Sequence, residues 1–334
     1  MSLAIVLVVC AGYYIYSILN FTRNIQDDNR SSKFAQFQQE TKQDEPPEWE
    51  GKDRVNILLL GGDSRGLGKN EIPRSDTMLI ASLDPVTKKA YLFSLLRDTY
   101  VPIPGHGSER INAAITLGGP ELAMKTVTEL TGIPIQYYVY TDFQGFIALI
   151  DAIGGIDFYV EKDMHYTSAA DHHQYDIDLK KGEQHLDGKT ALQYVRFRHD
   201  AMSDYARTER QRNFLQAVAQ KLKSTTSILK LPRILNAVDP YIETNLSIND
   251  MWKLGSLGYK IDTNNVVSVQ LPPQDLLREE NVGGASVVTV DSDRLKAFVQ
   301  DTFAPKTDVA DGDDNGQKQA GGVPGLSDSA ADQQ

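Results

Sequence analysis

Three short apolar runs, each ended by turn residues, constrain the fold of this chain most strongly. They cover residues 55–60, 78–83 and 90–96. Gly61 and Gly62 end the first run, and the turn at residues 84–87 separates the second run from the third. Apolar runs of this length between turn signals are typical of buried strands. The sequence therefore predicts a meander of three strands.

Charged residues flank these strands at one predicted edge. In an antiparallel meander, the end of the first strand, the start of the second and the end of the third lie together. The residues at that edge are Asp63, Arg65, Arg74, Asp76, Arg97 and Asp98. Asp63 and Asp76, beside arginines and a bound phosphate, would suit a hard divalent cation such as Mg²⁺. The alternative is that the two carboxylates only form salt bridges with Arg65 and Arg74.

Helix and strand patterns alternate after the meander. A helix that begins near Pro120 and ends at Gly132 is followed by strand-like residues 135–140, helix-like residues 143–153 and strand-like residues 155–160. This alternation predicts an α/β fold with helices on both faces of the sheet. Residues 247–259 favour a further helix, and residues 266–271 favour a strand that either completes the sheet or lies outside it.

A second group of arginines follows in residues 194–212. If residues 194–198 form a strand, Arg196 and Arg198 project from one face as a pair. The helix expected after Asp204 has an apolar stripe that also carries Arg207 and Gln211. A charged residue on an inward stripe is costly unless it is paired, and a helix N-terminus favours a bound anion. The pattern indicates a phosphate site, and the alternative is a set of solvated or locally paired arginines. Arg212 is expected at the surface.

The two ends of the chain differ from the middle. Residues 3–19 are uncharged and mostly apolar, which predicts a transmembrane anchor rather than a cleaved signal peptide or a buried helix. Residues 20–51 are polar and predict a spacer, and residues 306–334 have the composition of a disordered tail. The folded domain is expected over residues 52–305.

Composition excludes several function classes. The net charge of −11 would repel nucleic acid, so no nucleic-acid partner is expected. Cys10 is the only cysteine, which excludes an intrachain disulfide and a zinc site with several cysteines. Residues 61–70 lack the Gly-Lys-Ser/Thr ending of a nucleotide-binding P-loop, and no Gly-x-Ser-x-Gly hydrolase motif occurs.

Six motifs in this order resemble the LytR-CpsA-Psr family. They are Asp63-Ser64-Arg65, Arg74-Ser75-Asp76-Thr77, Leu96-Arg97-Asp98, Ile111-Asn112-Ala113-Ala114, residues 151–156, and residues 194–198 followed by Asp204, Arg207, Arg210 and Gln211. The resemblance covers roughly residues 54–223. It implies a three-layer α-β-α domain with a mixed central sheet, preceded by one transmembrane helix.

The resemblance also implies a function. Members of the family transfer an anionic glycopolymer, such as teichoic acid or capsule, from a polyprenyl pyrophosphate carrier to peptidoglycan. This chain is then expected to be a single-pass cell-membrane protein with an extracytoplasmic catalytic domain. The implied roles are metal binding (Mg²⁺ or Mn²⁺) for Asp63 and Asp76, pyrophosphate binding for Arg65, Arg74, Arg97, Arg196 and Arg198, and completion of the catalytic pocket for Asp204, Arg207 and Gln211.

Two rival functions remain open at this point. The family often carries the label of a transcriptional attenuator, against which the absence of a basic DNA-reading stretch speaks. The chain could also bind polyprenyl phosphate without catalysing a reaction.

Overall fold

The structure is a computed structural model that describes most of the chain. The described residues are 2–24, 32–37, 49–63, 71–168, 173, 175–198 and 203–304, without the side chains of residues 2–11, 203, 225 and 228. Arg65 and the expected tail, residues 306–334, lie outside the described residues.

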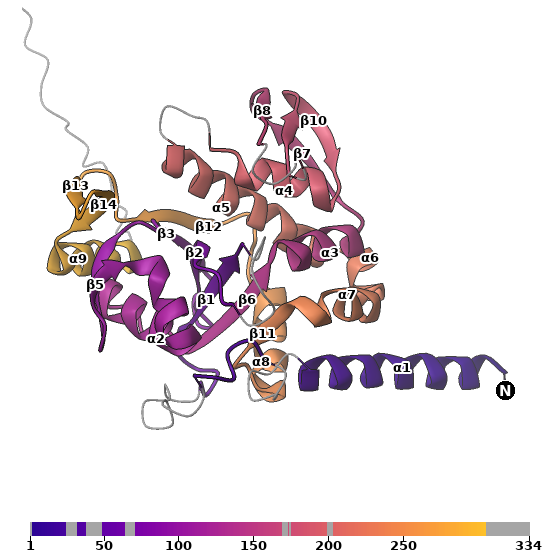
Figure 1. The fold of residues 1–334 in the computed structure, drawn as a ribbon. Coiled ribbons are helices and arrows are strands. Elements are labelled where there is room, and N and C mark those ends of the chain that lie inside the picture. The colour runs from indigo at the N-terminus through magenta and orange to yellow at the C-terminus, as the bar shows by residue number, and fades with distance from the viewer. Residues whose placement is uncertain are drawn as a thin grey trace, which may run out of the picture.

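A six-stranded sheet forms the centre of the domain, with the strand order β11-β6-β1-β2-β3-β12 (Figure 1). The predicted meander is confirmed, because β2 pairs antiparallel with both β1 and β3. Strand β6 runs parallel to β1, and β12 runs parallel to β3, so the sheet is mixed as expected. The strands are β1 (Val55–Gly62), β2 (Ser75–Leu83), β3 (Ala90–Leu95), β6 (Tyr137–Asp142), β11 (Ile242–Thr244) and β12 (Val266–Leu271).

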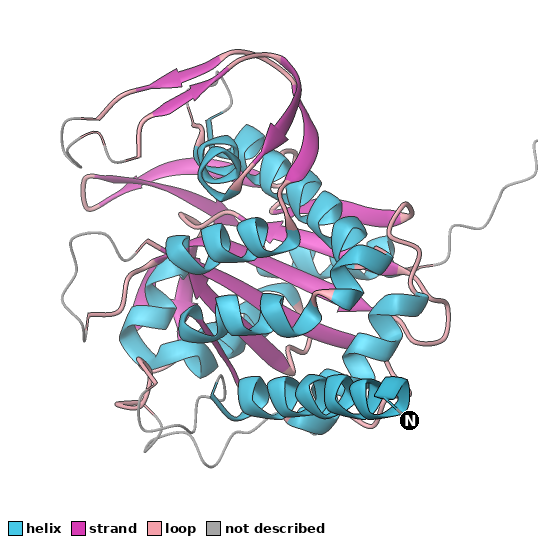
Figure 2. Ribbon diagram, turned by 90° about the vertical axis from the view of Figure 1, so that its right-hand side faces the viewer, coloured by secondary structure: helices cyan, strands magenta, loops and turns pink. Residues whose placement is uncertain are grey.

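Helices cover both faces of this sheet (Figure 2), and four hairpins formed by described residues lie outside it. The helices are α1 (Ser2–Asn24), α2 (Ala114–Thr131), α3 (Phe143–Ile153), α4 (Gly188–Arg196), α5 (Ser203–Leu222), α6 (Thr225–Leu229), α7 (Leu231–Val238), α8 (Ile248–Lys260) and α9 (Ser292–Phe303). The hairpins pair β4 (Tyr100–Ile103) with β5 (Gly107–Arg110), β7 (Ile156–Val160) with β10 (Gly182–Leu186), β8 (Met164–Tyr166) with β9 (Ile177–Leu179), and β13 (Leu277–Val282) with β14 (Ala285–Val290).

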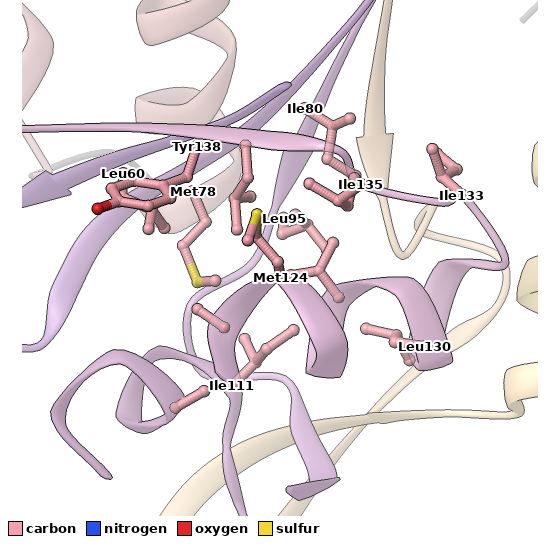
Figure 3. Packing of buried hydrophobic residues seen from close by; sticks show 14 of the residues in the cluster. Leu60, Met78, Ile80, Leu95, Ile111, Met124, Leu130, Ile133, Ile135 and Tyr138 are labelled. Carbon is pink, nitrogen blue, oxygen red and sulfur yellow. The ribbon is translucent and has the colours of Figure 1, made fainter. Parts of the chain in front are cut away.

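Alternating side chains of the sheet build two different cores. Leu58 and Leu60 of β1 point to the face covered by α2 and α9, where they pack with Ile80 and Met124 (Figure 3). Ile57, which precedes Leu58, points to the opposite face and packs with residues of α8. Burial on both faces explains why β1 reads as a continuous apolar run rather than as an alternating one.

A third core lies between α3, α4, α5 and the β7–β10 hairpin. The fully buried ring of Phe214 on α5 lies 5.3 Å from the ring of Phe158 on β7 and 6.0 Å from the ring of Tyr194 on α4. Strand β7, which the sequence placed in an α/β layer, pairs with β10 and not with the central sheet. Helix α5 is therefore covered on two sides, by the sheet and by this hairpin layer.

The N-terminal helix contacts the domain through its last turns. Ser17 Oγ donates to the Pro232 carbonyl at 3.4 Å, and Phe21 is buried against Val238 of α7. Among the residues whose placement is described, no helix has the length and apolarity needed to cross a bilayer. Most of the expected membrane span, residues 3–19, has side chains outside that description.

The segment expected to be a spacer contributes buried aromatic residues. Phe34 is 2% exposed and makes edge contacts with the rings of Tyr138 and Tyr140, at centroid distances of 6.4 and 5.1 Å. Trp49 is 6% exposed, and its Nε1 donates to the Asp53 carbonyl at 2.8 Å. The average composition of the segment is polar, so it does not reveal these few apolar side chains, which pack against the domain. The described parts of the segment are thus packed.

Candidate functional site

A pocket of about 740 Å³ lies between the central sheet and helices α3 and α5. Its apolar wall includes Leu59 and Leu79 from the sheet, Leu149 from α3, and Phe214 and Val218 from α5. Its polar end holds most of the residues singled out from the sequence. These are Asp63, Asp76, Arg97, Arg196, Arg198, Arg207 and Gln211. A cavity with one charged end and a long apolar wall suits a ligand with an anionic head and a hydrocarbon tail.

The strand register brings the predicted sheet edge together. Gly62 at the end of β1 lies opposite Ser75 at the start of β2, so the neighbouring residues Asp63 and Asp76 line the same pocket. Glycine is needed at position 62 because a Cβ there would stand 2.5 Å from the Tyr140 hydroxyl oxygen. The convergence that the meander predicted therefore occurs for Asp63, Asp76 and Arg97, which all line this pocket.

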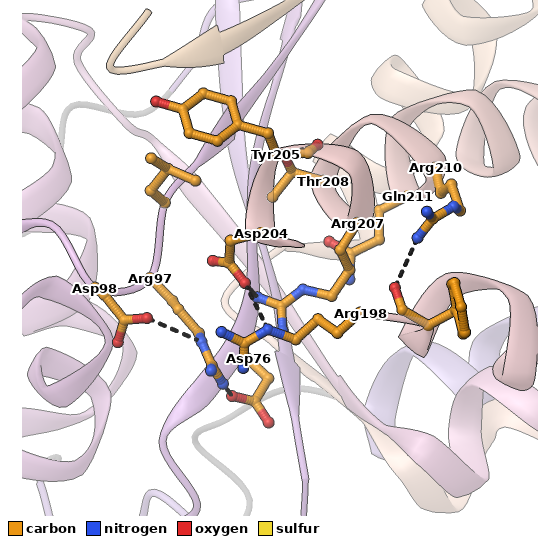
Figure 4. A network of polar contacts seen from close by, with 12 residues as sticks. Asp76, Arg97, Asp98, Arg198, Asp204, Tyr205, Arg207, Thr208, Arg210 and Gln211 are labelled. Carbon is orange, nitrogen blue, oxygen red and sulfur yellow. Dashed lines mark hydrogen bonds and ion pairs between the residues drawn. The ribbon is translucent and has the colours of Figure 1, made fainter. Parts of the chain in front are cut away.

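Arg97 is held between two carboxylates at this edge (Figure 4). Its Nη1 atom donates to Asp76, and its Nε atom lies 3.4 Å from Asp98 Oδ2. Arg110 Nη1 in turn donates to Asp98 Oδ1 at 3.1 Å. Burial alone would lower the pKa of Arg97, but the charges of Asp76 and Asp98 outweigh burial and raise it. Arg97 therefore stays cationic in the lining of the pocket.

Asp204 connects two further arginines. Arg198 Nε lies 3.1 Å from Asp204 Oδ1, and Arg207 Nη2 lies 2.7 Å from the same oxygen (Figure 4). Arg207 is only 5% exposed, and this burial lowers its pKa to about 10 against the opposing effect of Asp204. Neither Asp204 Oδ1 nor Arg207 Nε has a hydrogen-bond partner of good geometry among the described residues. The Nε–H of Arg207 can therefore donate to a ligand oxygen, and Asp204 Oδ1 can accept from a ligand hydroxyl.

Arg196 does not lie in a strand, so that prediction is wrong. It is the last residue of α4, which begins after Asp187, whose carboxylate accepts from the Thr190 amide. The Arg196 guanidinium lies over the rings of Phe143 and Tyr175, at 5.0 and 5.3 Å from their centroids. Its Nη1 donates to the Tyr175 carbonyl at 3.2 Å. Asp187 is an N-cap signal for a helix, and the alternation within residues 194–198 does not include that signal.

Arg210 and Arg212 are both buried, at 4% and 8% exposure. Arg210 Nε contacts Glu161 Oε1 at 2.7 Å, and its Nη1 donates to the Phe197 carbonyl at 2.6 Å. Arg212 Nη1 donates to Ser94 Oγ on β3. The expectation of surface exposure for Arg212 is wrong because α5 buries two faces, whereas the sequence reading allowed only one inward stripe.

Two predicted phosphate ligands are not placed in the pocket. Arg65 lies outside the described residues. Arg74 is 44% exposed at its side chain, and its Nη1 lies 3.8 Å from Glu109 Oε1 rather than among the lining residues. Gln211 does line the pocket and donates through Nε2 to the Val195 carbonyl at 3.3 Å.

Sequence reasoning missed Asp142, which also lines the pocket. Its Oδ1 accepts from the amides of Gln144 and Gly145 at 3.0 Å each and caps α3. Its Oδ2 lies 3.5 Å from Lys33 Nζ. An Asp immediately before an apolar helical pattern is a capping signal, and it would have placed this carboxylate at the sheet edge.

The donor set can be tested against a divalent cation. No group of three or more His, Cys, Asp or Glu side chains with metal-binding geometry occurs among the described residues. Mg²⁺ does not require such a cage, since it binds through one or two carboxylates together with phosphate oxygens and water. Asp63 and Asp76, in one pocket with arginines, fit this chemistry.

The LytR_cpsA_psr family matches residues 13–303 of the chain. Polyisoprenyl-teichoic acid–peptidoglycan teichoic acid transferase TagU of Enterococcus faecalis is 37% identical over 252 residues, covering 75% of this chain and 79% of that protein. Regulatory protein MsrR of Staphylococcus aureus is 32% identical over 252 residues, covering 74% of each. The structure of the family protein YwtF (TagT) of Bacillus subtilis with bound octaprenyl pyrophosphate lipid has a TM-score of 0.56 and 28% identity, covering 76% of this chain and 91% of that one.

Proposed function

This chain belongs to the LytR-CpsA-Psr family, and on that basis we propose that it transfers an anionic glycopolymer from a polyprenyl pyrophosphate carrier to peptidoglycan. The reaction is a phosphotransfer. A teichoic acid or a capsule-type polymer fits the proposal, given the transferase named TagU among its relatives.

The division of the pocket into a cationic end and an apolar wall carries this proposal. Arg97, Arg198 and Arg207 stand at one end, and guanidinium groups bind phosphate oxygens with two parallel hydrogen bonds. Leucine and phenylalanine side chains line the remainder, where an isoprenoid chain would be removed from water. The octaprenyl pyrophosphate bound to YwtF (TagT) has two parts that would match these surfaces, an anionic pyrophosphate and an apolar prenyl chain.

The chemistry follows from the residues at the cationic end. A sugar hydroxyl oxygen of peptidoglycan forms a bond to the phosphorus that carries the glycopolymer, and the bond from that phosphorus to the bridging oxygen breaks. Polyprenyl phosphate leaves, and Asp204 accepts the proton of the hydroxyl. Arg97, Arg198 and Arg207 stabilise the negative charge that develops on the phosphoryl oxygens.

Asp63 and Asp76 are the residues that would hold Mg²⁺ or Mn²⁺ in this proposal. A bound divalent cation supplies charge neutralisation to the phosphate oxygens. The pair Asp76–Arg97 then links the metal ligand to the phosphate ligand, so both would be positioned as one unit.

We further propose that α1 anchors the protein in the cell membrane and that the domain acts on the outer side. Residues 3–10 are all apolar or uncharged, and Tyr13, Tyr14 and Tyr16 follow them as interfacial aromatics would. The lipid tail keeps such a substrate in the bilayer. An enzyme anchored in the same membrane would therefore stay close to its substrate.

A turnover assay tests the transferase. The full chain in detergent would be mixed with a polyprenyl pyrophosphate-linked glycan, peptidoglycan oligomers and Mg²⁺, and formation of the linked product would be followed. We expect product that disappears in Arg198→Ala, while the far-UV circular dichroism of that variant is unchanged. Binding of the lipid without any product would contradict the enzyme and support a binding protein.

The relative MsrR is named as a regulatory protein, which keeps a regulatory role as the second candidate. Specific DNA binding by the full chain at moderate salt would support that candidate. The acidic net charge of −11 opposes such binding.

A further inference from the structure

The corner between α6 and α7 presents an exposed apolar residue beside two cations. Leu229 is 71% exposed, and Lys230 and Arg233 are both exposed. Neither cation makes an ion pair with a described residue. We call these three residues, Leu229, Lys230 and Arg233, the α6–α7 corner. A single exposed leucine is common on protein surfaces, but beside two exposed cations it has the combination of side chains found where a helix contacts a lipid headgroup region.

The charge around the corner contrasts with the rest of the chain. The chain has 45 acidic residues, yet residues 210–238 contain none. The same stretch carries six cations, which are Arg210, Arg212, Lys221, Lys223, Lys230 and Arg233. Two of them, Arg210 and Arg212, are buried, so the exposed charge is concentrated toward the corner. This part of the surface is complementary to an anionic partner.

Helix α1 packs against the end of α7, one of the two helices that form the α6–α7 corner. Asn24 Nδ2 donates to Asp239 Oδ2 at 2.9 Å, and Phe21 of α1 and Val238 of α7 are buried together. Helix α1 extends away from the domain beside α7, with the N-terminus at its far end (Figure 1). The corner therefore lies on the side of the domain from which α1 leaves.

The α1–α7 contact also adjoins the apolar wall of the pocket. Leu149 and Ile242 pack against Phe21 and Val238, and both residues line the pocket as well. Two side chains thus belong to the pocket on one side and to the helix contact on the other. A partner that binds α7 would therefore also set how the apolar wall of the pocket is oriented relative to that partner.

We propose that the α6–α7 corner docks on an anionic lipid bilayer. Leu229 enters the zone between headgroups and acyl chains, while Lys230 and Arg233 contact lipid phosphates. Docking holds the apolar end of the pocket toward the membrane, where a lipid-linked substrate would enter. The proposal rests on the anchoring proposed for α1 and is independent of the phosphotransfer chemistry.

A fluorescent probe at the corner tests this contact. Because Cys10 is the only cysteine, Cys10→Ser gives a cysteine-free chain into which Leu229→Cys introduces one labelling site. Val282→Cys is the matched control, since Val282 is 36% exposed on the β13–β14 hairpin, on the side of the domain opposite α1 (Figure 1). Each full-length variant would carry an environment-sensitive dye and be reconstituted in phosphatidylglycerol vesicles that contain nitroxide-labelled lipid.

We expect quenching of the dye at position 229 to be at least about threefold stronger than at position 282. Equal quenching at the two positions in vesicle-bound protein would overturn the proposal. Failure of the protein to float with the vesicles would overturn the anchoring by α1 as well. A corner that binds a second copy or another protein instead would leave the dye at position 229 inaccessible to lipid quencher.

Lipid charge supplies a second arm. Quenching at position 229 should fall when phosphatidylcholine replaces phosphatidylglycerol, and it should fall similarly in phosphatidylglycerol when Lys230→Glu and Arg233→Glu are combined. Indifference to both changes would remove the electrostatic part of the proposal. Turnover of the double variant in detergent should equal that of the parent chain, because neither residue lines the pocket. A failure of docking is thereby separated from a failure of the transferase.

Discussion

On helix α5, Arg207 follows Asp204 by three residues, and its Nη2 atom approaches the Asp204 carboxylate to 2.7 Å. The same carboxylate oxygen lies 3.1 Å from Arg198 Nε. One anion therefore holds two cations at the polar end of the pocket. A pyrophosphate that binds both arginines would compete with Asp204 for them and release its carboxylate to accept a proton.

Replacement of this carboxylate gives the first prediction. Asp204→Asn keeps the shape of the side chain but removes its charge and its basicity, so kcat should fall by about 10²–10⁴. Affinity for a polyprenyl pyrophosphate should hold or increase, since the arginines lose a competitor. A parallel loss of affinity and turnover, measured by lipid binding and product formation, would assign Asp204 to positioning instead of proton transfer.

The metal assignment is tested by comparing two partners of Arg97. Asp76→Asn should raise the Mg²⁺ concentration needed for half-maximal turnover by at least about tenfold, a loss of about 1.4 kcal/mol in metal binding. Asp98→Asn also removes a carboxylate next to Arg97, but Asp98 does not line the pocket. Its Mg²⁺ titration should match that of the parent chain. Equal shifts in both variants would mean that the effect passes through Arg97.

The sequence predicted the sheet edge because its determinants are local. Three strands that follow one another in the sequence and pair antiparallel leave little freedom in where Asp63, Asp76 and Arg97 lie, although residues 63–74 separate β1 from β2. The parallel pairing of β12 with β3 joins residues about 175 positions apart in the chain, which no local pattern encodes. For that reason the sequence left the place of residues 266–271 open.

The arginines were harder to predict for a different reason. Residues 194–198 alternate polar and apolar side chains as a strand does, yet residues 194–196 complete a helix capped by Asp187, and Phe197 is its C-cap. Arg210 and Arg212 are buried because tertiary layers cover α5 on two sides, and the period of the helix alone does not reveal how many of its faces are covered. Charge on a helix of this kind is a poor guide to exposure.

Arg212 and Ser94 provide a prediction about stability. Burial lowers the pKa of Arg212, and Ser94, which is 1% exposed, accepts its hydrogen bond. Ser94→Ala leaves a buried cation without that partner and should destabilise the domain by about 1–3 kcal/mol. Arg212→Met removes the cation itself and should cost less. Urea unfolding of the two variants checks this order, and the reverse order would show that Arg212 has a stabilising role.

Asp84 should make stability depend on acid pH. Burial would raise the pKa of Asp84, but the backbone amides of Thr87 and Val86 together with Arg54 lower it below the ordinary value of 3.8 for an aspartate. The pKa of Asp84 is lower in the folded state than in the unfolded state. The ionised carboxylate therefore contributes its full share to the free energy of unfolding above pH about 5, and this contribution is lost as the pH falls through the pKa of the folded state. Asp84→Asn should therefore lower the Tm at neutral pH, and the difference from the parent chain should shrink toward pH 2. A constant difference in Tm would contradict the assignment.

The aromatic environment of Arg196 gives a prediction about geometry. A guanidinium is planar and stacks on rings, whereas the ammonium of lysine is a compact charge without a planar face. The Arg196 guanidinium lies over Phe143 and Tyr175 and donates to the Tyr175 carbonyl. Arg196→Lys preserves the charge but should weaken pyrophosphate binding by roughly tenfold, about 1.4 kcal/mol, through loss of this orientation.

Arg233→Lys, at an exposed position outside the pocket, is the matched control and should bind pyrophosphate as the parent chain does. Binding to inorganic pyrophosphate and to the lipid-linked form can both be measured by calorimetry. If Arg196→Lys binds both ligands as the parent chain does, charge alone accounts for the role of Arg196, and the two rings only fill space around it.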